Sequence, residues 1–275
     1  MVRPPGLPSG GGGIACGLGR TLIAKDGVLR PRTIAAIGAA RAAGIHVLLA
    51  TGRMYRSALP YAQAAGIDDP LVCYQGAAVV DPVSGEWLLH EPIPLELAKE
   101  AIAAVEEEGF GLNCYVDDRL YVSELTDNAR SYADFQSLEI TEVGDLLAWL
   151  ERPPTKLVVV AEPAALDELR PRLVSRFGER LFVAKSLPHF LEFASPRVSK
   201  GTGLAFVAEH LGFTAAKTVA FGDGENDLEL LEWAGFGVAV ENADELLRAR
   251  ADWVCPGPAE EGVAAVIEAY LDSRP

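Results

Sequence analysis

Three carboxylates lie close together in a loop that follows a short apolar stretch. Residues 218–221 are typical of a buried strand, and Asp223, Glu225 and Asp227 follow within the sequence Gly-Asp-Gly-Glu-Asn-Asp. In an open parallel sheet, ligands bind beyond the carboxyl ends of the strands, where this loop must lie. Neighbouring carboxylates repel one another, so a hard cation such as Mg²⁺ is the simplest compensation. An alternative interpretation is a helix start capped by Asp227, with solvated neighbours.

A second candidate loop follows the apolar stretch 45–50. Thr51 offers a hydroxyl group, and Gly52 leads into a stretch with helical spacing. Backbone N–H groups point outward at the start of a helix, and this arrangement suits a phosphate group. Junctions of this composition also occur for purely geometric reasons, so the pattern alone leaves both interpretations open.

The third candidate is Lys200, which follows Ser199 at the predicted start of a helix over residues 201–212. Ser199 is a suitable N-cap for that helix. A cation in the first turn opposes the helix dipole, at a cost of about 0.3–1 kcal/mol. Either full solvation or an anionic partner would account for a lysine at this position.

The elements that must position these loops alternate between strands and helices. Apolar stretches typical of strands lie at 45–50, 71–74, 218–221 and 237–240, and they are interleaved with helical stretches at 33–44, 54–66, 201–212 and 228–234. This alternation predicts an α/β fold with a parallel sheet and crossover helices. Glycines at the ends of three of the helical stretches are natural stops.

The middle of the chain has a different pattern, with prolines at its junctions. Strand-like stretches lie at 115–122, 157–161 and 181–193, and helical stretches lie at 95–108 and 164–177. We therefore expect an inserted α+β domain over residues 84–196. Residues 1–83 and 197–275 would then fold together as one discontinuous domain.

Composition narrows the class of protein. A chain of 275 residues with 49% hydrophobic and 23% charged residues is typical of a globular cytoplasmic protein. The net charge of −15 argues against a nucleic-acid partner, which would require clustered basic residues. No apolar run approaches the ~18 residues of a membrane span. The four cysteines are widely spaced, which favours buried free thiols. The sequence does not specify an oligomeric state.

Taken in order, the motifs resemble those of the haloacid dehalogenase-like (HAD) phosphatases, in particular the Cof type with a large α/β cap. The resemblance extends from Thr21 to the C-terminus and rests on six segments, at 51–53, 74–77, 199–201, 222–227, 240–243 and 260–263. It implies a Rossmann-like core with a parallel sheet. The cap of this family would correspond to the insertion at 84–196.

The resemblance also implies an activity and roles for matching residues. The activity would be Mg²⁺-dependent hydrolysis of a small phosphorylated metabolite through an aspartyl-phosphate. Asp223 would ligate Mg²⁺ directly, and Asp227 would support the metal indirectly. The transferring phosphoryl group would be bound by Lys200, Thr51, Asn226 and the backbone of Gly52.

The first motif departs from the family pattern of strand-Asp-x-Asp-Gly-Thr-Leu. Gly17 stands at the position of the nucleophile and Gly19 at that of the general acid/base, with Arg20 in place of the usual glycine. Glycine can neither form an aspartyl-phosphate nor transfer a proton. Deleting a nucleophile can cost ~10⁶-fold in turnover. We therefore expect a degenerate active site with absent or severely impaired hydrolysis.

The same departure weakens the implied metal site. Of the family's inner ligands, only Asp223 and the backbone carbonyl of Gly19 remain, so we expect weak Mg²⁺ affinity. Two hypotheses stay open: an enzyme with residual phosphatase activity, and a non-catalytic protein that binds a phosphorylated metabolite. The abrupt end of the resemblance upstream of Thr21 fits either a degenerate first motif or an altered reading of the N-terminal part of the gene.

A dinucleotide-binding loop around Gly17 is disfavoured. That fingerprint requires a third glycine at position 22, which is leucine here. It also requires an acidic residue about 20 positions further on, and residues 28–67 contain none.

Overall fold

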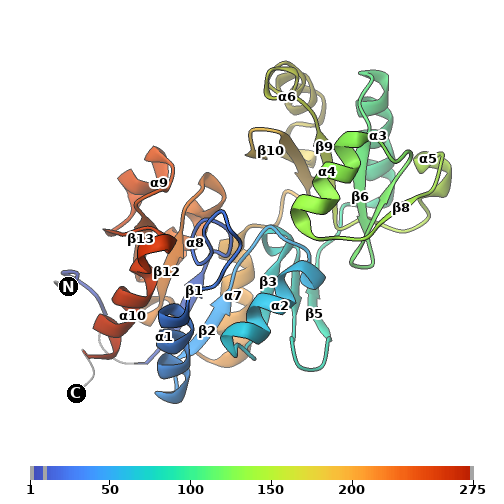
Figure 1. Ribbon diagram of the computed structural model, residues 1–275. Coiled ribbons are helices and arrows are strands. Elements are labelled where there is room, and N and C mark those ends of the chain that lie inside the picture. Colours follow the sequence, from blue (N-terminus) through green and yellow to red (C-terminus); the bar gives the residue numbers. More distant parts are fainter. Residues whose placement is uncertain (1–2, 9–10, 273–275) are drawn as a thin grey trace. The chain divides into compact units, whose positions relative to one another are not determined.

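The computed structural model describes residues 3–8 and 11–272, which divide into two compact units (Figure 1). The first unit combines the described residues up to Leu89 with those from Ser199 onward, and the second unit is His90–Val198. The boundary lies later than the predicted Ser84 because strand β5 (Trp87–His90) joins a small sheet of the first unit. Independent folding of the two units stays a prediction.

A five-stranded parallel sheet forms the centre of the first unit. Its order is β14–β13–β12–β1–β2, and the strands are β1 (Gly13–Cys16), β2 (His46–Leu49), β12 (Val219–Gly222), β13 (Phe236–Val240) and β14 (Trp253–Cys255). Every pairing in this sheet is parallel. Strand β1, which lies between β12 and β2, is buried along its whole length. The predicted α/β fold with a parallel core sheet is therefore confirmed.

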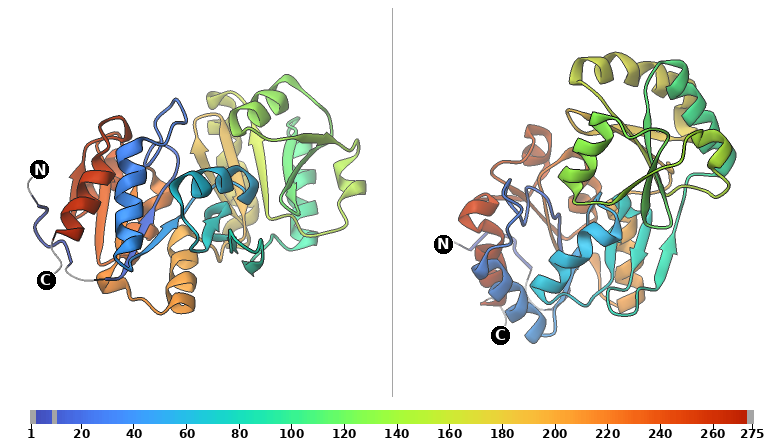
Figure 2. Two further views of the ribbon diagram at one scale, coloured as in Figure 1. Left: turned by 60° about the horizontal axis from the view of Figure 1, so that its bottom comes forward. Right: turned by 45° about the vertical axis from the view of Figure 1, so that its right-hand side comes forward.

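Helices flank this sheet, and those close to the predicted places are α1 (Pro31–Ala42), α2 (Tyr55–Ala65), α7 (Lys200–Leu211) and α8 (Leu228–Trp233). The sequence analysis did not predict α9 (Glu245–Arg250) and α10 (Gly262–Leu271). Helix α1 lies beside α10, as blue and red helices in Figure 2, and α7 lies beside α8. Helix α1 starts two residues before its predicted start at Thr33, because Pro31 occupies the first helical position, where its fixed φ angle is favourable.

Glycines at the start of strand β1 allow it to approach its neighbours closely. A Cβ atom at Gly12 would lie 2.2 Å from the carbonyl oxygen of Lys217. A Cβ atom at Gly13 would lie 2.7 Å from the ring of Phe213. The glycine-rich segment before β1 lacks the apolar residues expected of a longer strand, and it is compatible with the short strand β1 that the structure has.

A tight turn of a small three-stranded sheet packs against the start of helix α7. The small sheet β3 (Leu71–Cys73), β4 (Ala78–Val80) and β5 contains a 3₁₀ turn, Tyr74–Gly76, between its first two strands. All three residues of the turn have positive φ angles, of 52°, 60° and 98°. A Cβ atom at Gly76 would lie 1.9 Å from the carbonyl oxygen of Ser199, so only glycine fits there. The turn thereby lies directly against the start of α7.

The second unit contains a six-stranded mixed sheet of order β10–β11–β9–β6–β7–β8. Its strands are β6 (Leu112–Val116), β7 (Arg119–Val122), β8 (Ile140–Glu142), β9 (Lys156–Val160), β10 (Phe182–Leu187) and β11 (Phe190–Ala194). Its helices are α3 (Leu95–Glu107), α4 (Asp127–Gln136), α5 (Leu146–Trp149) and α6 (Pro163–Phe177). The predicted strand-like stretches 115–122 and 181–193 are each two strands joined by a turn. This mixed sheet, separate from the parallel one, agrees with the predicted α+β insertion.

Candidate functional site

Asp227 holds the loop that follows strand β12. Its Oδ2 atom accepts hydrogen bonds from the N–H groups of Asp223 at 2.9 Å and Gly224 at 3.1 Å. The residue is 1% exposed. Asp227 therefore closes the turn that precedes it and makes no side-chain cap bond to helix α8, unlike the alternative interpretation of the sequence. Its Oδ1 atom points to a different partner.

That partner is Lys200, the first residue of helix α7. Ser199 is the N-cap and shares reciprocal hydrogen bonds with Thr202. The Lys200 Nζ atom donates to Asp227 Oδ1 at 2.5 Å, with side chains that are 5% and 1% exposed. Of the two explanations for a cation at this position, the structure shows an anionic partner, which is a carboxylate of the same chain.

Asp223 is buried at the carboxyl end of β12, and both of its oxygens are engaged. Oδ1 accepts a hydrogen bond from the hydroxyl of Thr21 at 2.7 Å, and Oδ2 lies 3.3 Å from Nη1 of Arg20. Burial, followed by the neighbouring charge of Asp227, raises the pKa of Asp223 to about 6. The Thr21 hydrogen bond and the charges of Lys200 and Arg20 lower this pKa and only partly offset the rise.

Gly17 and Gly19 follow the end of β1 and have different surroundings. The Gly17 N–H donates to the carbonyl of Phe221 at 2.8 Å, which continues the pairing of β1 with β12. A Cβ atom at Gly17 would lie 2.8 Å from the Thr21 hydroxyl oxygen. A Cβ atom at Gly19 would meet no atom within 4 Å in the described part of the chain. Thr21 thus lies where a side chain at position 17 would begin, whereas position 19 is open.

The sequence analysis assigned no role to Arg20, which also belongs to this site. Its backbone is left-handed, with φ of 62°. Its guanidinium donates to the carbonyl of Asn242 at 2.9 Å and lies 3.9 Å from the carboxylate of Asp244. The Asn242 side chain in turn donates to the Arg20 carbonyl at 2.9 Å. The available signal was an arginine at a glycine position of the first motif, in a chain with an acidic loop at residues 223–227.

Thr51 and Gly52 are linked to the acidic loop through Gln75. Thr51 is 4% exposed, its hydroxyl accepts from the Arg53 N–H at 3.1 Å, and its carbonyl accepts from the Gln75 N–H at 3.0 Å. The Gln75 Oε1 atom accepts from the Asn226 side chain at 3.0 Å. A Cβ atom at Gly52 would lie 2.5 Å from the Gln75 amide, so the glycine leaves room for that side chain.

These contacts bring all the predicted site residues together at one edge of the parallel sheet, within the first unit. Hydrogen bonds and ion pairs connect the first motif to the acidic loop, the acidic loop to Lys200, and the acidic loop through Gln75 to Thr51. The roles assigned to these residues in binding phosphate stay predictions.

The residues present do not fit a Mg²⁺ site. Mg²⁺ prefers octahedral oxygen ligation with one or two carboxylates. The oxygens of Asp223 face Thr21 and Arg20, and those of Asp227 face Lys200 and backbone N–H groups. Among residues 3–8 and 11–272, no group of three or more His, Cys, Asp or Glu side chains is arranged to hold a metal. The assignment of Asp223, Asp227 and the Gly19 carbonyl to a metal remains what the resemblance implies.

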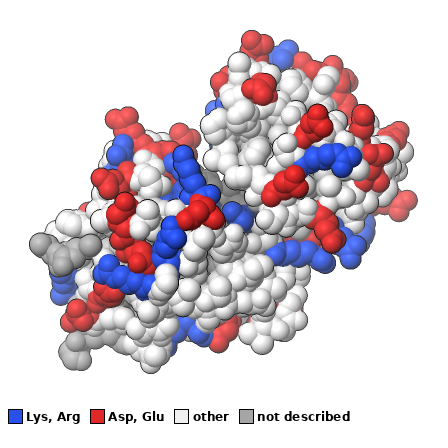
Figure 3. Space-filling view, viewed as in Figure 1, with Lys and Arg blue, Asp and Glu red and all other residues white. Residues whose placement is uncertain are grey.

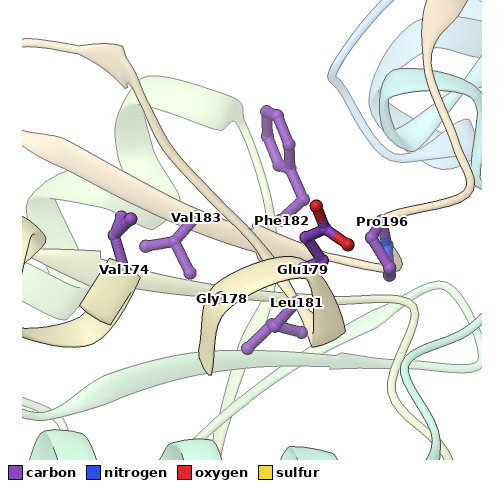
Figure 4. A pocket seen from close by; sticks show the side chains of 7 residues that line it. All are labelled: Val174, Gly178, Glu179, Leu181, Phe182, Val183 and Pro196. Carbon is purple, nitrogen blue, oxygen red and sulfur yellow. The ribbon is translucent and has the colours of Figure 1, made fainter. Parts of the chain in front are cut away.

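The second unit has a cavity of about 600 Å³ that lacks the chemistry of a phosphate site (Figure 4). Its lining is Val174, Gly178, Glu179, Leu181, Phe182, Val183 and Pro196. The charged member of this lining is an acid, which would repel an anion. None of the residues predicted to bind phosphate lines this cavity.

Other expectations concern the cysteines, the surface and the membrane. All four cysteines are buried free thiols, as predicted. Acidic and basic side chains are interspersed over the face shown in Figure 3. No helix within the described ranges is both long and apolar enough to cross a membrane. The absence of a nucleic-acid partner stays a prediction.

Known proteins resemble this chain along nearly its whole length. The profile of the haloacid dehalogenase-like hydrolases matches residues 14–267. A pyridoxal phosphate phosphatase of Escherichia coli is 29% identical over 271 residues, covering 94% of this chain and 98% of the relative. A phosphoglycolate phosphatase of Archaeoglobus fulgidus is 31% identical over 247 residues, covering 88% and 92%.

Solved structures of similar proteins have the same fold as this chain. The crystal structure of the protein TM0651 from Thermotoga maritima has a TM-score of 0.84 at 31% identity and covers 94% of this chain and 97% of that one. A HAD/COF-like hydrolase from Plasmodium vivax shares the fold, with a TM-score of 0.84 at 23% identity. The family profile, the relatives and the motif order all point the same way, and the chain belongs to the haloacid dehalogenase-like hydrolases of the Cof type.

Proposed function

We propose that this chain binds the phosphate group of a small phosphorylated metabolite in the first unit and hydrolyses the ester slowly or not at all. One observation supports this proposal: Lys200, Asp227 and Asn226 lie in one connected site. The first loop of that site has glycine at positions 17 and 19. The groups suited to holding a phosphate are present. The carboxylates that would attack phosphorus and transfer a proton are not.

Lys200 is the principal anion-binding group. An ammonium group has three donors, and Asp227 accepts one of them. Because the side chain is only 5% exposed, a charge-assisted hydrogen bond to phosphate would be little weakened by solvent. The hydroxyl of Thr51 and the side chain of Asn226 lie on the loops joined through Gln75. They would orient the phosphate oxygens.

The relatives suggest the class of ligand. Their names specify pyridoxal phosphate and phosphoglycolate, which are both phosphate monoesters of small molecules. We infer the same chemical class for this chain. The individual metabolite would be selected by groups beyond the phosphate.

Calorimetry tests the binding. Inorganic phosphate, pyridoxal phosphate and phosphoglycolate are titrated into the full chain, into Lys200→Met and into the matched control Lys25→Met, whose lysine is exposed. We expect at least one ligand to bind the parent and the control. Lys200→Met should weaken that binding at least about tenfold, equivalent to about 1.4 kcal/mol. Absence of binding for all three ligands, or equal affinity in Lys200→Met, would overturn the proposal.

A phosphate-release assay tests the turnover. We expect the parent chain to release phosphate about 10⁴-fold or more slowly than a working enzyme of this kind, because the covalent route requires a nucleophile. The double variant Gly17→Asp, Gly19→Asp returns both carboxylates. Rapid release by the parent chain would contradict impaired hydrolysis.

A further inference from the structure

Arg20 places a positive charge beside the one carboxylate that the family pattern assigns directly to a metal. Its Nη1 atom lies 3.3 Å from Asp223 Oδ2, and the remaining oxygen of that carboxylate accepts from Thr21. A divalent ion approaching Asp223 would meet the guanidinium, because a second cation close to Oδ2 is repelled by the first. The contact therefore competes with metal binding at its main ligand.

The conformation of Arg20 shows that its position is imposed by the surrounding contacts. Its φ of 62° lies in the left-handed region, which is unfavourable for a residue with a side chain and natural for the glycine of the family motif. Asn242 holds the residue from both sides, by donating to its carbonyl and by accepting from its guanidinium. Such strained residues persist where other contacts fix them, and they gather at functional sites.

A count of charges supports the same conclusion. A site with Mg²⁺ and aspartates at positions 17 and 19 would combine +2, −1 and −1, a sum of 0. This chain has glycine at both positions and arginine at position 20, which together contribute +1 without any metal. Asp223, Asp227 and Lys200 are common to both arrangements. The loss of two carboxylates and the gain of one guanidinium thus give the site more positive charge than a metal-loaded one, before any divalent ion binds.

We propose that the Arg20 guanidinium is the resident cation of this site and takes the place of a divalent metal. The negative charge of the acidic loop is then balanced by a side chain of the same protein, and the site does not require Mg²⁺ for charge balance. This inference concerns the cation alone, so it holds whether or not the site binds a phosphate monoester.

Titration with MnCl₂ tests the proposal without any phosphate present. Mn²⁺ suits the same oxygen ligands as Mg²⁺ and can be followed by calorimetry or by the loss of its free paramagnetic signal. The proteins are the full-length parent, Arg20→Ala and Arg20→Gly, and the control is Arg250→Ala, which removes an exposed ion pair with Glu232. Both variants remove the positive charge. Alanine keeps a Cβ atom on the left-handed backbone, whereas glycine relieves the backbone strain, so comparing the two variants separates the loss of charge from the relief of strain.

We expect both Arg20 variants to bind Mn²⁺ at least about tenfold more tightly than the parent and the control. Thermal unfolding provides a second readout. Added MgCl₂ should raise the Tm of the two Arg20 variants, because a ligand that binds the folded state stabilises it, and should leave the Tm of the parent unchanged. Mn²⁺ affinities within about threefold of one another in the parent and both variants would overturn the proposal. A Tm that MgCl₂ raises as much in the parent as in the variants would do the same.

Discussion

Lys200 and Asp227 are 27 residues apart in the sequence and form an ion pair that is almost fully removed from water, with 5% and 1% of the side chains exposed. The pair joins the first turn of α7 to the loop that follows β12. It therefore fixes one half of the candidate site relative to the other, and its loss should affect stability as well as ligand binding.

Replacing Lys200 with methionine should lower the free energy of unfolding by about 3–5 kcal/mol, because Asp227 would remain buried without its cation. Urea denaturation at neutral pH measures the change. The double variant Lys200→Met, Asp227→Asn should recover part of the loss, since asparagine is uncharged and still accepts from the backbone of the loop. A Lys200→Met variant as stable as Lys25→Met would show that the pair contributes nothing measurable.

Alanine at positions 17 and 19 should have effects of opposite sign. Gly17→Ala places a Cβ atom 2.8 Å from the Thr21 hydroxyl, which is held by Asp223, so we expect a loss of about 1–3 kcal/mol. Gly19→Ala enters open space and should stabilise by about 0.4–1 kcal/mol by restricting the unfolded chain. Thermal and urea unfolding of the parent and the two variants measure these changes in the free energy of unfolding. Shifts in the same direction would contradict the described surroundings of the two glycines.

The cysteines should be unreactive in the folded chain. Burial, together with the charge of Cys255, raises the pKa of the Cys16 thiol far above its usual range, and burial raises the pKa of Cys114 and of Cys255 to about 12. Since the thiolate is the reactive form, we expect negligible reaction with a disulfide reagent at pH 8 and reaction of all four thiols in urea. One fast equivalent in the native protein would contradict this expectation.

His90 should make stability decline on the acid side of pH 6.5. Burial lowers the pKa of His90 from 6.5, against the opposing charges of Asp117 and Glu91, and its Nε2 atom lies 2.9 Å from the Thr155 hydroxyl. A histidine with a lowered folded pKa binds its proton more readily when unfolded, so its stabilising contribution is complete above pH 6.5 and is lost as the pH falls below that value. Because the side chain is partly exposed, we expect an effect of under about 1 kcal/mol.

The measurement is urea unfolding of the parent and His90→Gln between pH 5 and pH 7.5. The glutamine variant, which keeps a hydrogen-bonding group near Thr155, should show a smaller decline. Parallel curves for the two proteins would assign the acid dependence to other groups.

The core strands could be predicted because buried parallel strands are continuous apolar stretches. Residues 46–49, 219–222 and 236–240 are such strands, and helices α2 and α7 end at glycine C-caps. The stretch 115–122 was different. Its two strands are separated by Asp117 and Asp118 with φ of 49° and 55°, and no glycine or proline indicated the turn. Helix α4 was missed because its polar composition gives little apolar periodicity.

The candidate site likewise contains some features that the sequence indicates and others that it does not. The loops carrying Thr51, Lys200 and Asp223 could be recognised because each comes after a strand or begins a helix. The contacts of Arg20 could not, because they depend on a left-handed backbone and on Asn242, which is 222 residues away in the sequence. Likewise, the position of the Thr21 hydroxyl beside Gly17 follows from its bond to Asp223 rather than from local sequence.

The strand order of the parallel sheet also determines when the site can assemble during synthesis. Strand β1 pairs with β12, so this pairing waits until more than two hundred further residues have been made. Until then the apolar strand β1 lacks its partner on the side away from β2, and contacts this distant in sequence form slowly. Residues 90–198 emerge in the interval as a continuous segment. A ribosome-bound chain halted before Val219 should therefore expose aggregation-prone strands and require a chaperone.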